Sequence, residues 1–410
     1  MSAFSIFLHN VFIRLYYAAA RILALFDSKA RKWVKGRKTV WEELQKLPVS
    51  DSRVWFHCAS LGEYEQALPL IEKLRAKSSV LVTFYSPSGY EVVKKKNPEA
   101  QLFYLPLDTK SNARKFMDIA QPSLAIFVRY DLWYYYLNEL KQRSIRSFLI
   151  SAVYHHDAVF FRWYGTFFRG MLQCFTHIFV QDENSKTVLN ENGFQNVTKA
   201  GDTRIDRVAA IAQNAPQFPL IEKFKGDRKL FIIGSLEPKD EPVALPLIHH
   251  PAFKGQFRFI IAPHDTGKKS VERLTSLIKN KTSPYSACKA ETIAENEVVL
   301  IDSIGMLSRL YAFADIAYIG GGFGEGLHNV LEPAVWGVPV LFGPKHRKFV
   351  EAVELLQTGG AFCVNNAEEA IEKTAQLCSC NELLKKAGSK AEEYIRDRKG
   401  ATEIILRAIG

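Results

Sequence analysis

The sequence predicts an α/β protein made of two doubly wound domains. Short apolar runs alternate with helical patterns along most of its 410 residues, which is the order expected of parallel sheets covered by helices on both faces. A chain of this length exceeds one ordinary hydrophobic core, so two domains are expected. The alternation is interrupted around residues 214–226, where Pro216 and Pro219 lie in a segment without strand character. We therefore place the domain boundary there.

Residues 1–38 are expected to form a membrane-associated arm. Residues 4–26 are almost all apolar or aromatic, but Arg14 and Arg21 interrupt them, which argues against an ordinary transmembrane helix. Six basic residues follow within 29–38, as expected of a patch on anionic lipid. The sequence therefore predicts that an anionic membrane surface is one partner of the chain.

The polar residues of the arm fall at helical spacing on an otherwise apolar helix and form a narrow stripe made of Asn10, Arg14, Tyr17 and Arg21. This pattern favours an amphipathic helix that lies in the membrane interface. We expect peripheral or monotopic attachment at the cytoplasmic face of the inner membrane. The alternative is a helix buried against the body of the protein.

The first domain is expected over residues 39–213. Its predicted strands are 53–57, 80–85, 101–105, 124–128, 147–151, 177–180 and 197–200. Ligands of such sheets bind at the carboxyl ends of the strands. Glu63 follows the first of these strands, at the start of a predicted helix, where a carboxylate can be either a capping group or a catalytic group.

The second domain is expected over residues 227–390, followed by a C-terminal helix over 391–410. Its predicted strands are 230–233, 257–262, 298–301, 316–319, 338–342 and 361–364. After the strand at 316–319 come five glycines and then an amphipathic segment that begins near Asn329. Glycines allow close approach of a ligand, and the N-terminus of a helix favours an anion. The glycine spacing matches neither the dinucleotide-binding nor the P-loop motif.

The string H-N-V-L-E-P-A-V-W-G-V-P-V-L-F-G-P, residues 328–344, resembles the donor-site signature of the Kdo transferases. These enzymes move 3-deoxy-D-manno-octulosonic acid (Kdo) from CMP-Kdo onto a lipid A precursor. Residues 55–71 are similar to the S-V-G-E segment of that family, whose glutamate is the catalytic base. Further matches lie at 33–38, 201–207 and 234–241, so the resemblance covers nearly the whole chain in the family's order.

This resemblance implies a glycosyltransferase-B architecture, in which two Rossmann-like domains face a cleft. The acceptor would bind the N-terminal half and the donor the C-terminal half. The catalytic residues it implies are Glu63 and Asp131. The acceptor-binding residues it implies are Ser60, Gly62 and Arg129. The donor-binding residues are Gly234, Ser235, His264, Gly321, Gly322, Phe323, Gly324, Asn329 and Glu332, with Glu332 on the ribose hydroxyls and Asn329 near the phosphate.

Two positions depart from the family pattern. Arg129 stands where relatives usually have a glutamate, so an acid role is in doubt there and a cation could bind a phosphate or carboxylate instead. His264 lies in A-P-H, where many relatives have P-R-H. The work of the missing arginine would then fall on another cation, such as Lys345, Arg347 or Lys348.

The composition of the chain indicates which kinds of molecule it binds. The formal net charge of +11 indicates an anionic partner, and because no nucleic-acid-binding motif accompanies it, we expect a phosphorylated substrate and a membrane rather than nucleic acid. The six cysteines are scattered and lack the paired spacing of a zinc site. No Asp-x-Asp pair is evident, so we expect neither a metal nor a cofactor.

These observations together predict an inverting glycosyltransferase. In this hypothesis Glu63 deprotonates a sugar hydroxyl of the lipid A precursor, which attacks the anomeric carbon of Kdo as CMP leaves. One alternative is another two-domain glycosyltransferase, or a nucleotide-sugar epimerase of the same architecture. A second alternative is a catalytically inactive protein that binds a membrane surface, against which the presence of Glu63 and Glu332 argues.

Overall fold

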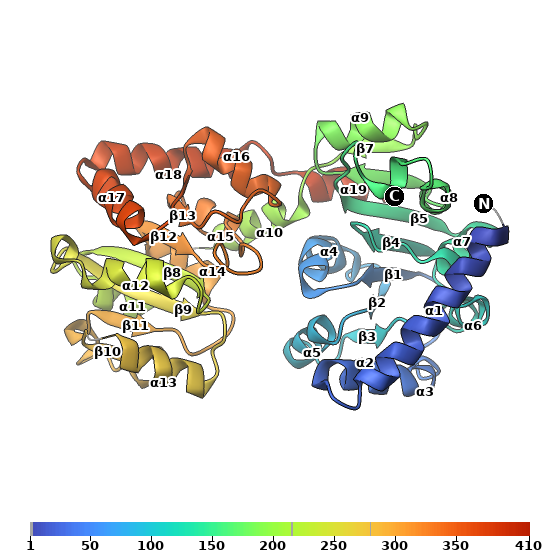
Figure 1. Ribbon diagram of the computed structural model, residues 1–410, viewed down its shortest axis with the longest axis horizontal. Helices are drawn as coiled ribbons and strands as arrows, with labels where there is room; N and C mark the ends of the chain where they lie inside the picture. Colours follow the sequence, from blue (N-terminus) through green and yellow to red (C-terminus); the bar gives the residue numbers. More distant parts are fainter. Residues whose placement is uncertain (1–2, 215, 279) are drawn as a thin grey trace. The chain divides into compact units, whose positions relative to one another are not determined.

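The computed structural model describes residues 3–214, 216–278 and 280–410. The chain forms two compact units, Met1–Asp206 with Gly400–Gly410 and Arg207–Lys399 (Figure 1). Each unit is built on a parallel sheet with helices packed against it, so the predicted two-domain α/β fold is confirmed. The predicted boundary segment contains the helix α11 (Pro219–Lys225), and its residue 215 lies outside the described residues.

The described residues of the first unit form a seven-stranded parallel sheet with the order β3-β2-β1-β4-β5-β6-β7. Its strands are β1 (Arg53–Cys58), β2 (Ser79–Phe84), β3 (Gln101–Tyr104), β4 (Leu124–Val128), β5 (Arg146–Ala152), β6 (His177–Val180) and β7 (Val197–Lys199). Each lies within one or two residues of a predicted strand. All six residues of β1 are buried, as expected of a central strand covered on both faces.

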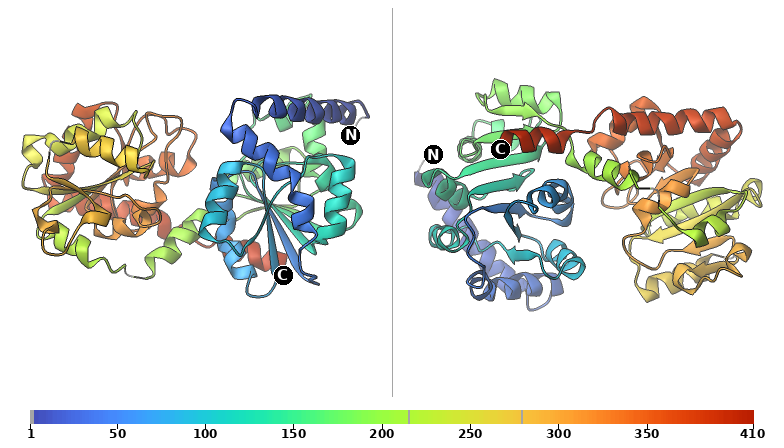
Figure 2. Two further views of the ribbon diagram at one scale, coloured as in Figure 1. Left: turned by 90° about the horizontal axis from the view of Figure 1, so that it is seen from below. Right: turned by 180° about the vertical axis from the view of Figure 1, so that it is seen from behind.

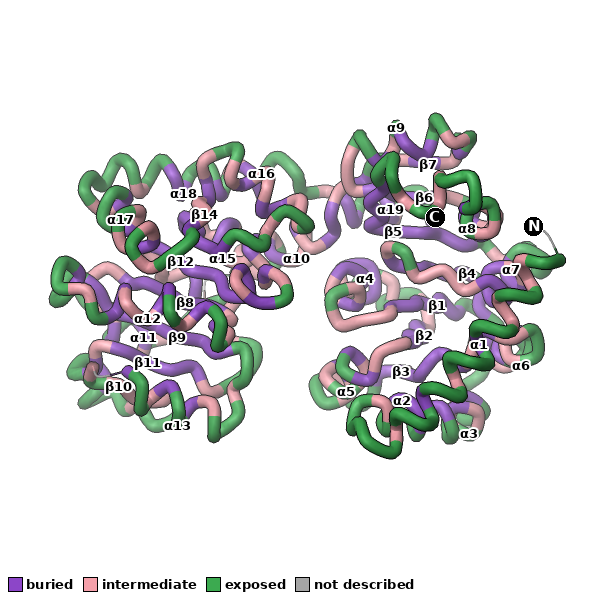
Figure 3. Tube along the Cα trace, viewed as in Figure 1, coloured by how far each residue is buried: buried purple, intermediate pink, exposed green. Residues whose placement is uncertain are grey.

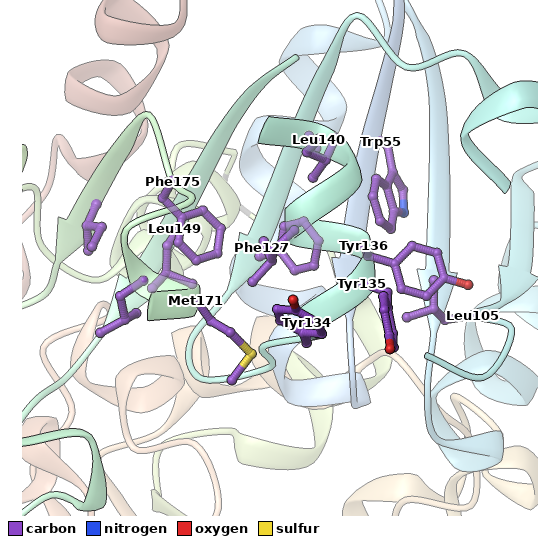
Figure 4. Close-up of a cluster of buried hydrophobic side chains, with 14 of the residues drawn as sticks. Trp55, Leu105, Phe127, Tyr134, Tyr135, Tyr136, Leu140, Leu149, Met171 and Phe175 are labelled. Atoms are coloured by element: carbon purple, nitrogen blue, oxygen red, sulfur yellow. The ribbon is translucent and has the colours of Figure 1, made fainter. Parts of the chain in front are cut away.

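Helices of the first unit pack on both faces of this sheet. They are α1 (Ala3–Leu23), α2 (Ser28–Lys38), α3 (Val40–Leu44), α4 (Leu61–Leu74), α5 (Pro87–Lys96), α6 (Lys110–Ala120), α7 (Tyr134–Gln142), α8 (Thr166–Leu172), α9 (Glu183–Glu191) and α19 (Ala401–Ile409). Alternate strand residues enter two separate cores. Trp55 and Phe127 pack with Tyr136 in one core (Figure 4), and Phe56 and Ile126 belong to the other.

The second unit contains an analogous parallel sheet with the order β10-β11-β9-β8-β12-β13-β14. Its strands are β8 (Lys229–Leu236), β9 (Phe257–Pro263), β10 (Thr282–Pro284), β11 (Val298–Leu300), β12 (Ile316–Ile319), β13 (Val340–Phe342) and β14 (Ala361–Cys363). The edge strand β10 was not predicted because its sequence, Thr-Ser-Pro, contains no apolar run. The main helices are α10 (Thr203–Ala212), which spans the boundary, α12 (Glu241–His249), α13 (Lys268–Leu277), α16 (Val350–Thr358), α17 (Ala367–Cys378) and α18 (Asn381–Arg396).

The C-terminal prediction was partly wrong. Instead of one helix over 391–410, α18 ends at Arg396 and α19 begins at Ala401. Gly400 lies between them with a φ of 117°, a left-handed conformation that ends helical continuation. The helix α19 belongs to the first unit, where Ile405 and Ile409 enter the core beside α4.

Both sheets change winding direction at one pair of strands. The chain passes from β1 to β2 on one side and later returns to β4 on the other side of β1. In the second sheet β8 lies in the same way between β9 and β12. Ligands of doubly wound sheets bind outside the carboxyl ends of the strands at such a switch point. We therefore expect ligand-binding residues after β1 and β4 in the first unit, and after β8 and β12 in the second.

The helix α1 lies along the first unit (Figures 1 and 2), and within its polar stripe Asn10 and Tyr17 are half-buried whereas Arg14 and Arg21 are exposed. His9 pairs with the buried Asp108, Nε2 to Oδ2 at 2.8 Å, and the Tyr135 hydroxyl donates to Asn10 Oδ1 at 2.9 Å. Most residues of α1 are exposed (Figure 3), and they include large apolar side chains such as Phe12 and Leu15, which are 62% and 64% exposed.

Within residues 3–23, only Ile13 and Ala20 are buried, so α1 is not a core helix. Among the described residues it is also the one helix whose length and composition would suffice to cross a membrane. Arg14 and Arg21 were expected to exclude a transmembrane helix, but α1 meets the length and composition criteria for one in spite of these two arginines. Such a helix near an N-terminus is by itself weak support for membrane association.

The basic run after α1 is not wholly available to lipid. Five of its six cations are exposed, but Arg37 is buried. Its guanidinium donates to the carbonyl oxygens of Leu105 and Tyr85 and lies 3.8 Å from the ring centre of Trp33. Burial lowers the pKa of Arg37 to about 10, so it remains charged near neutral pH. Arg37 therefore braces α2 against the sheet edge.

Candidate active site

Glu63 lies in the turn between β1 and α4, at the switch point of the first sheet. Ser60 caps α4, with its hydroxyl accepting a hydrogen bond from the Glu63 N–H at 3.4 Å. The Glu63 carboxylate accepts a hydrogen bond from the Ala59 N–H. The capping arrangement is therefore present. A Cβ placed on Gly62 would meet no atom within 4 Å outside its own helix turn, so the turn is open at Gly62.

The pKa of Glu63 is raised to about 7. Burial is the main cause, because it disfavours the charged carboxylate, and the negative charge of Asp131 adds to it. The Ala59 N–H and the Arg129 cation act in the opposite direction. A carboxylate with a pKa near neutrality has the proton affinity that a general base needs.

Asp131 follows β4 and is held in place from β1. His57, fully buried on β1, contacts the Asp131 carboxylate through Nε2 and the Thr83 hydroxyl through Nδ1 at 2.8 Å. The Trp133 indole N–H lies 3.1 Å from Asp131 Oδ2. His57 therefore holds the Asp131 carboxylate in position.

Arg129 has the backbone geometry of a constrained residue. Its φ is 62°, in the left-handed region that non-glycine residues seldom occupy. Its positive charge lowers the pKa of both Glu63 and Asp202, so it lies within electrostatic reach of two acids. Its Nε is buried and has no hydrogen-bond partner among the described residues. Arg129 therefore has a donor available close to Glu63.

Residues 201–207 form hydrogen bonds that connect α4 with α19 in the first unit. The Thr203 hydroxyl donates to the carbonyl oxygen of Gln66 at 2.6 Å, and Asp202 pairs with Arg204. Asp206 accepts hydrogen bonds from the N–H groups of Gly400 and Thr402 and so holds the start of α19. This motif thus joins α4, the end of the first unit and α19.

In the second unit, the glycine turn after β12 is organised by a residue to which the sequence assigned no role. Asp240 is fully buried, and its carboxylate accepts hydrogen bonds from the Gly321 N–H at 2.7 Å, the Phe323 N–H at 3.3 Å and the Tyr318 hydroxyl at 3.2 Å. Asp240 lies within the matched segment 234–241, which was the available signal. Its carboxylate fixes the turn from inside the unit.

The glycines of both loops permit close backbone packing. A Cβ on Gly320 would lie 2.2 Å from the Ser235 carbonyl oxygen, and one on Gly322 would lie 2.5 Å from the Gly343 nitrogen. A Cβ on Gly234 would lie 1.9 Å from the Tyr311 hydroxyl. Ser235 itself has a φ of 52° at a β-bulge in β8. Close backbone packing therefore defines the shape of the turn.

The helix predicted after the glycines is short, because α15 spans only Leu331–Ala334. Gly337, with a φ of 67°, follows closely and turns the chain away. The N–H groups of Gly321, Phe323 and Gly324 already donate hydrogen bonds within the unit. The expected anion site, a helix N-terminus with free N–H groups, is thus smaller than predicted.

Polar side chains of the second edge come from three loops. The Asn329 amide donates to Glu332 Oε1 at 3.2 Å. His328 Nε2 lies 3.0 Å from Glu237 Oε1, and the His328 and His264 rings stack with centres 4.7 Å apart. The structure thus brings the predicted His264 near the glycine turn, next to His328 and Glu237.

These three side chains, Glu237, His264 and His328, also form a group of metal-ligand type within the described residues. Their ligand atoms lie within 4.8 Å of one another. Imidazole and carboxylate are ligands that zinc accepts, so this donor set could hold an ion. The expectation of a metal-free protein therefore stays a prediction.

Known proteins resemble this chain over most of its length. Residues 31–207 match the family model described as 3-deoxy-D-manno-octulosonic-acid transferase (kdotransferase). The 3-deoxy-D-manno-octulosonic acid transferase of Rickettsia felis is 29% identical over 385 residues, which are 89% of this chain and 81% of the relative. The protein of the same name from Aquifex aeolicus is 27% identical over 358 residues, 85% of this chain and 90% of the relative.

Solved structures with the same fold are more distant in sequence. The UDP-GlcNAc 2-epimerase of Neisseria meningitidis, bound to UDP-GlcNAc, superposes with a TM-score of 0.59 at 16% identity, covering 87% of this chain and 99% of that one. MurG of Acinetobacter baumannii superposes with a TM-score of 0.54 at 15% identity, covering 87% and 99%. These likenesses show the two-domain fold and nothing further.

Proposed function

We propose that the chain, which resembles the 3-deoxy-D-manno-octulosonic acid (Kdo) transferases over most of its length, is a glycosyltransferase that transfers Kdo from CMP-Kdo to a hydroxyl of a lipid A precursor. The observation that carries this proposal is the placement of Glu63. It lies at the carboxyl end of β1, at the switch point of the first sheet, with a pKa of about 7. This is the place and the proton affinity expected of the base.

In the proposed reaction, Glu63 takes the proton from the attacking hydroxyl of the acceptor. The oxygen then forms a bond to the anomeric carbon of Kdo, the bond from that carbon to the CMP phosphate breaks, and the configuration inverts. Burial and, to a smaller extent, the negative charge of Asp131 keep the pKa of Glu63 high, while His57 and Trp133 hold Asp131 in position. Asp131 thus supports the base by its charge.

Arg129 would bind an anionic group of a substrate beside the base. Its unpaired Nε and its proximity to Glu63 support this role, since both substrates carry phosphate or carboxylate groups. Ser60 and Gly62 would border the acceptor hydroxyl, because the Ser60 cap fixes the turn and Gly62 leaves space next to it.

The second unit would bind the donor. Glu332, oriented by Asn329, would accept hydrogen bonds from the ribose hydroxyls of CMP. The strand end at Gly234 and Ser235 and the turn from Gly321 to Gly324 would form the wall against which the nucleotide packs. Departure of CMP needs positive partial charge near the phosphate, which His264 and the cations after β13 can provide.

The exposed apolar side of α1 and the five exposed cations of the basic run support association with the cytoplasmic face of the inner membrane. The structure brings this arm to the carboxyl edge of the first sheet. His9, Asn10 and Tyr16 contact residues that follow β3, β4 and β2 respectively. A lipid held at the membrane would therefore reach the edge that carries Glu63.

The direct test is product analysis. The purified full chain is incubated with CMP-Kdo and a lipid A precursor in detergent, and the products are examined by mass spectrometry. We expect the acceptor to gain the mass of one or more Kdo residues as CMP is released. Release of CMP without a Kdo-bearing lipid, or epimerisation of a UDP-sugar, would contradict the proposed acceptor and favour the alternative functions.

A further inference from the structure

A pocket of about 320 Å³ lies between α1, α2 and the loop after β2. Its walls are largely apolar and aromatic, and the residues that matter here are Ala19, Ala20, Leu23, Trp33, Tyr85 and Pro87. Polar ligands lose hydrogen bonds to water in such surroundings, whereas hydrocarbon gains by entering them. The lining therefore favours a hydrocarbon occupant.

One wall of the pocket is continuous with the exposed apolar side of α1. Leu23 lines the pocket and is itself 57% exposed, and its neighbour Ile22 is 62% exposed. Lys29, which also lines the pocket, belongs to the basic run. Hydrocarbon thus has an apolar path from the outer side of α1, and the charged groups that line the pocket are one cation, Lys29, and one carboxylate, Asp27.

The back wall is rigid. The Arg37 guanidinium lies 3.8 Å from the ring centre of Trp33 and 4.8 Å from that of Tyr85. It also donates a hydrogen bond to the Tyr85 carbonyl oxygen at 3.0 Å. A cation that holds two aromatic rings and the backbone in place preserves the shape of the pocket before any ligand arrives.

Two short chains of contacts join this wall to the catalytic carboxylates. The Tyr85 ring stacks on Trp133 at 4.8 Å between centres, and the Trp133 indole N–H lies 3.1 Å from Asp131 Oδ2. Ser86, which also lines the pocket, donates its N–H to the Ala59 carbonyl oxygen at 2.8 Å, and the Ala59 N–H donates to Glu63. An occupant of the pocket would lie next to the reaction site.

We propose that this pocket binds an acyl chain of the lipid acceptor and thereby places the sugar hydroxyl at Glu63. The inference rests on the proposed function and adds a specificity determinant to it. The enzyme would distinguish acylated from deacylated acceptors at this pocket, through acceptor binding rather than through the chemical step.

The test fills the pocket without touching the catalytic groups. In Ala19→Trp a large ring replaces a methyl group in the lining, whereas Ala18→Trp makes the same change at the adjacent exposed position, which does not line the pocket. We expect Ala19→Trp to raise KM for the acylated acceptor by at least about tenfold, because that corresponds to losing the burial of about two methylenes. Ala18→Trp should behave like the unsubstituted chain.

Two further readouts separate this proposal from the proposed function. Activity on a deacylated, water-soluble acceptor and affinity for CMP should be unchanged in Ala19→Trp, which also shows that the variant is folded. Glu63→Gln would instead abolish transfer to both acceptors. If Ala19→Trp and Ala18→Trp have the same KM for the acylated acceptor, the pocket does not bind its acyl chain.

Photocrosslinking examines the unsubstituted chain, in case Ala19→Trp fails to fold. A lipid acceptor with a diazirine near the end of one acyl chain is irradiated with the full-length protein, and the crosslinked peptides are mapped by mass spectrometry. We expect crosslinks on Trp33, Tyr85 and the Ala19–Ala20 side of α1. Crosslinks confined to Phe12 and Leu15 would mean that the chains remain in the surrounding detergent or bilayer, which would overturn the proposal.

Discussion

The carboxyl edges of the two sheets share a framework of parallel strands in a similar order but carry different residues. In both, the candidate residues follow the strands on either side of a switch point, and both have a left-handed serine at a β-bulge, Ser151 in β5 and Ser235 in β8. The first edge is lined by ionisable side chains, chiefly Glu63, Asp131 and Arg129. The second is built from glycine backbone around the buried Asp240.

This difference indicates a division of labour. A side chain whose pKa is tuned by burial and by neighbouring charges can exchange a proton, so the first edge suits chemistry. The buried Asp240 carboxylate holds the glycine turn in one conformation, and a preformed surface of this kind suits ligand binding at the second edge. The framework sets where each site lies, and the side chains set which task it performs. Variants of the two edges should therefore separate catalysis from binding.

The largest effect is expected at the first edge. Glu63→Gln keeps the size and polarity of the side chain but removes the base, so kcat for Kdo transfer should fall by about 10²–10⁴-fold. CMP-Kdo affinity, measured by calorimetry, should stay nearly unchanged because the donor is assigned to the second unit. Transfer within about tenfold of the unsubstituted enzyme would rule out Glu63 as the base.

The pH dependence examines the same carboxylate without mutating it. Below its pKa of about 7, Glu63 is protonated and cannot accept a proton, so kcat/KM should rise about tenfold per pH unit up to neutrality and then level off. In Asp131→Asn the negative charge that raises this pKa is removed, so the rise should move to lower pH. An identical profile in both proteins would show that Asp131 does not tune the base.

At the second edge, Glu332→Ala should weaken CMP binding by about 1.5–3 kcal/mol, since the ribose hydroxyls lose a charged acceptor. The matched control is Glu325→Ala, which removes an exposed carboxylate from the same glycine turn. Calorimetric titration with CMP measures both. Equal affinities of the two variants would remove Glu332 from the donor site.

Asp240→Ala should act on folding rather than on the reaction. The Gly321 and Phe323 N–H groups would lose their acceptor, which should cost about 1–3 kcal/mol of unfolding free energy. Thermal or urea unfolding measures this, with the exposed Lys239→Ala as control. Unchanged stability would mean that the turn does not depend on Asp240 for its shape.

The last prediction concerns metal removal, for which we expect no change in activity. If the reaction needs no metal, a chelator should leave kcat unchanged, even though Glu237, His264 and His328 form a ligand-like group. Loss of activity in EDTA that magnesium or zinc restores would refute the metal-free mechanism. Repeating the assay with His328→Ala would then locate the ion.

Much of this framework could be predicted from the sequence because strands buried on both faces consist mainly of apolar residues. The β1 and β12 runs, R-V-W-F-H-C and I-A-Y-I, each stand between turn residues. The exception, β10, is an edge strand with a proline, and edge strands need no apolar run. Helix ends set by one residue, such as Gly400, were also missed.

The site was predicted less completely, because the residues that hold the candidate site in place contact partners far away in the sequence. His57 reaches Asp131 over 74 residues, and Asp240 reaches Gly321 over 81. No local pattern encodes such pairs. The contacts of α1 could not be predicted either, because His9 pairs with Asp108 and Asn10 accepts from Tyr135, and only the folded first unit brings these residues to the helix.

The return of α19 to the first unit has a consequence for biosynthesis. Asp206 and the Gly400 N–H that it caps are separated by 194 residues, so the ribosome makes the two partners about 10–40 s apart at 5–20 residues per second. During that interval the α4 side of the first unit lacks Ile405 and Ile409 and leaves an apolar surface uncovered. The unit that carries Glu63 is therefore completed only after α19 has been synthesised, and until then its apolar surface is of the kind that chaperones bind.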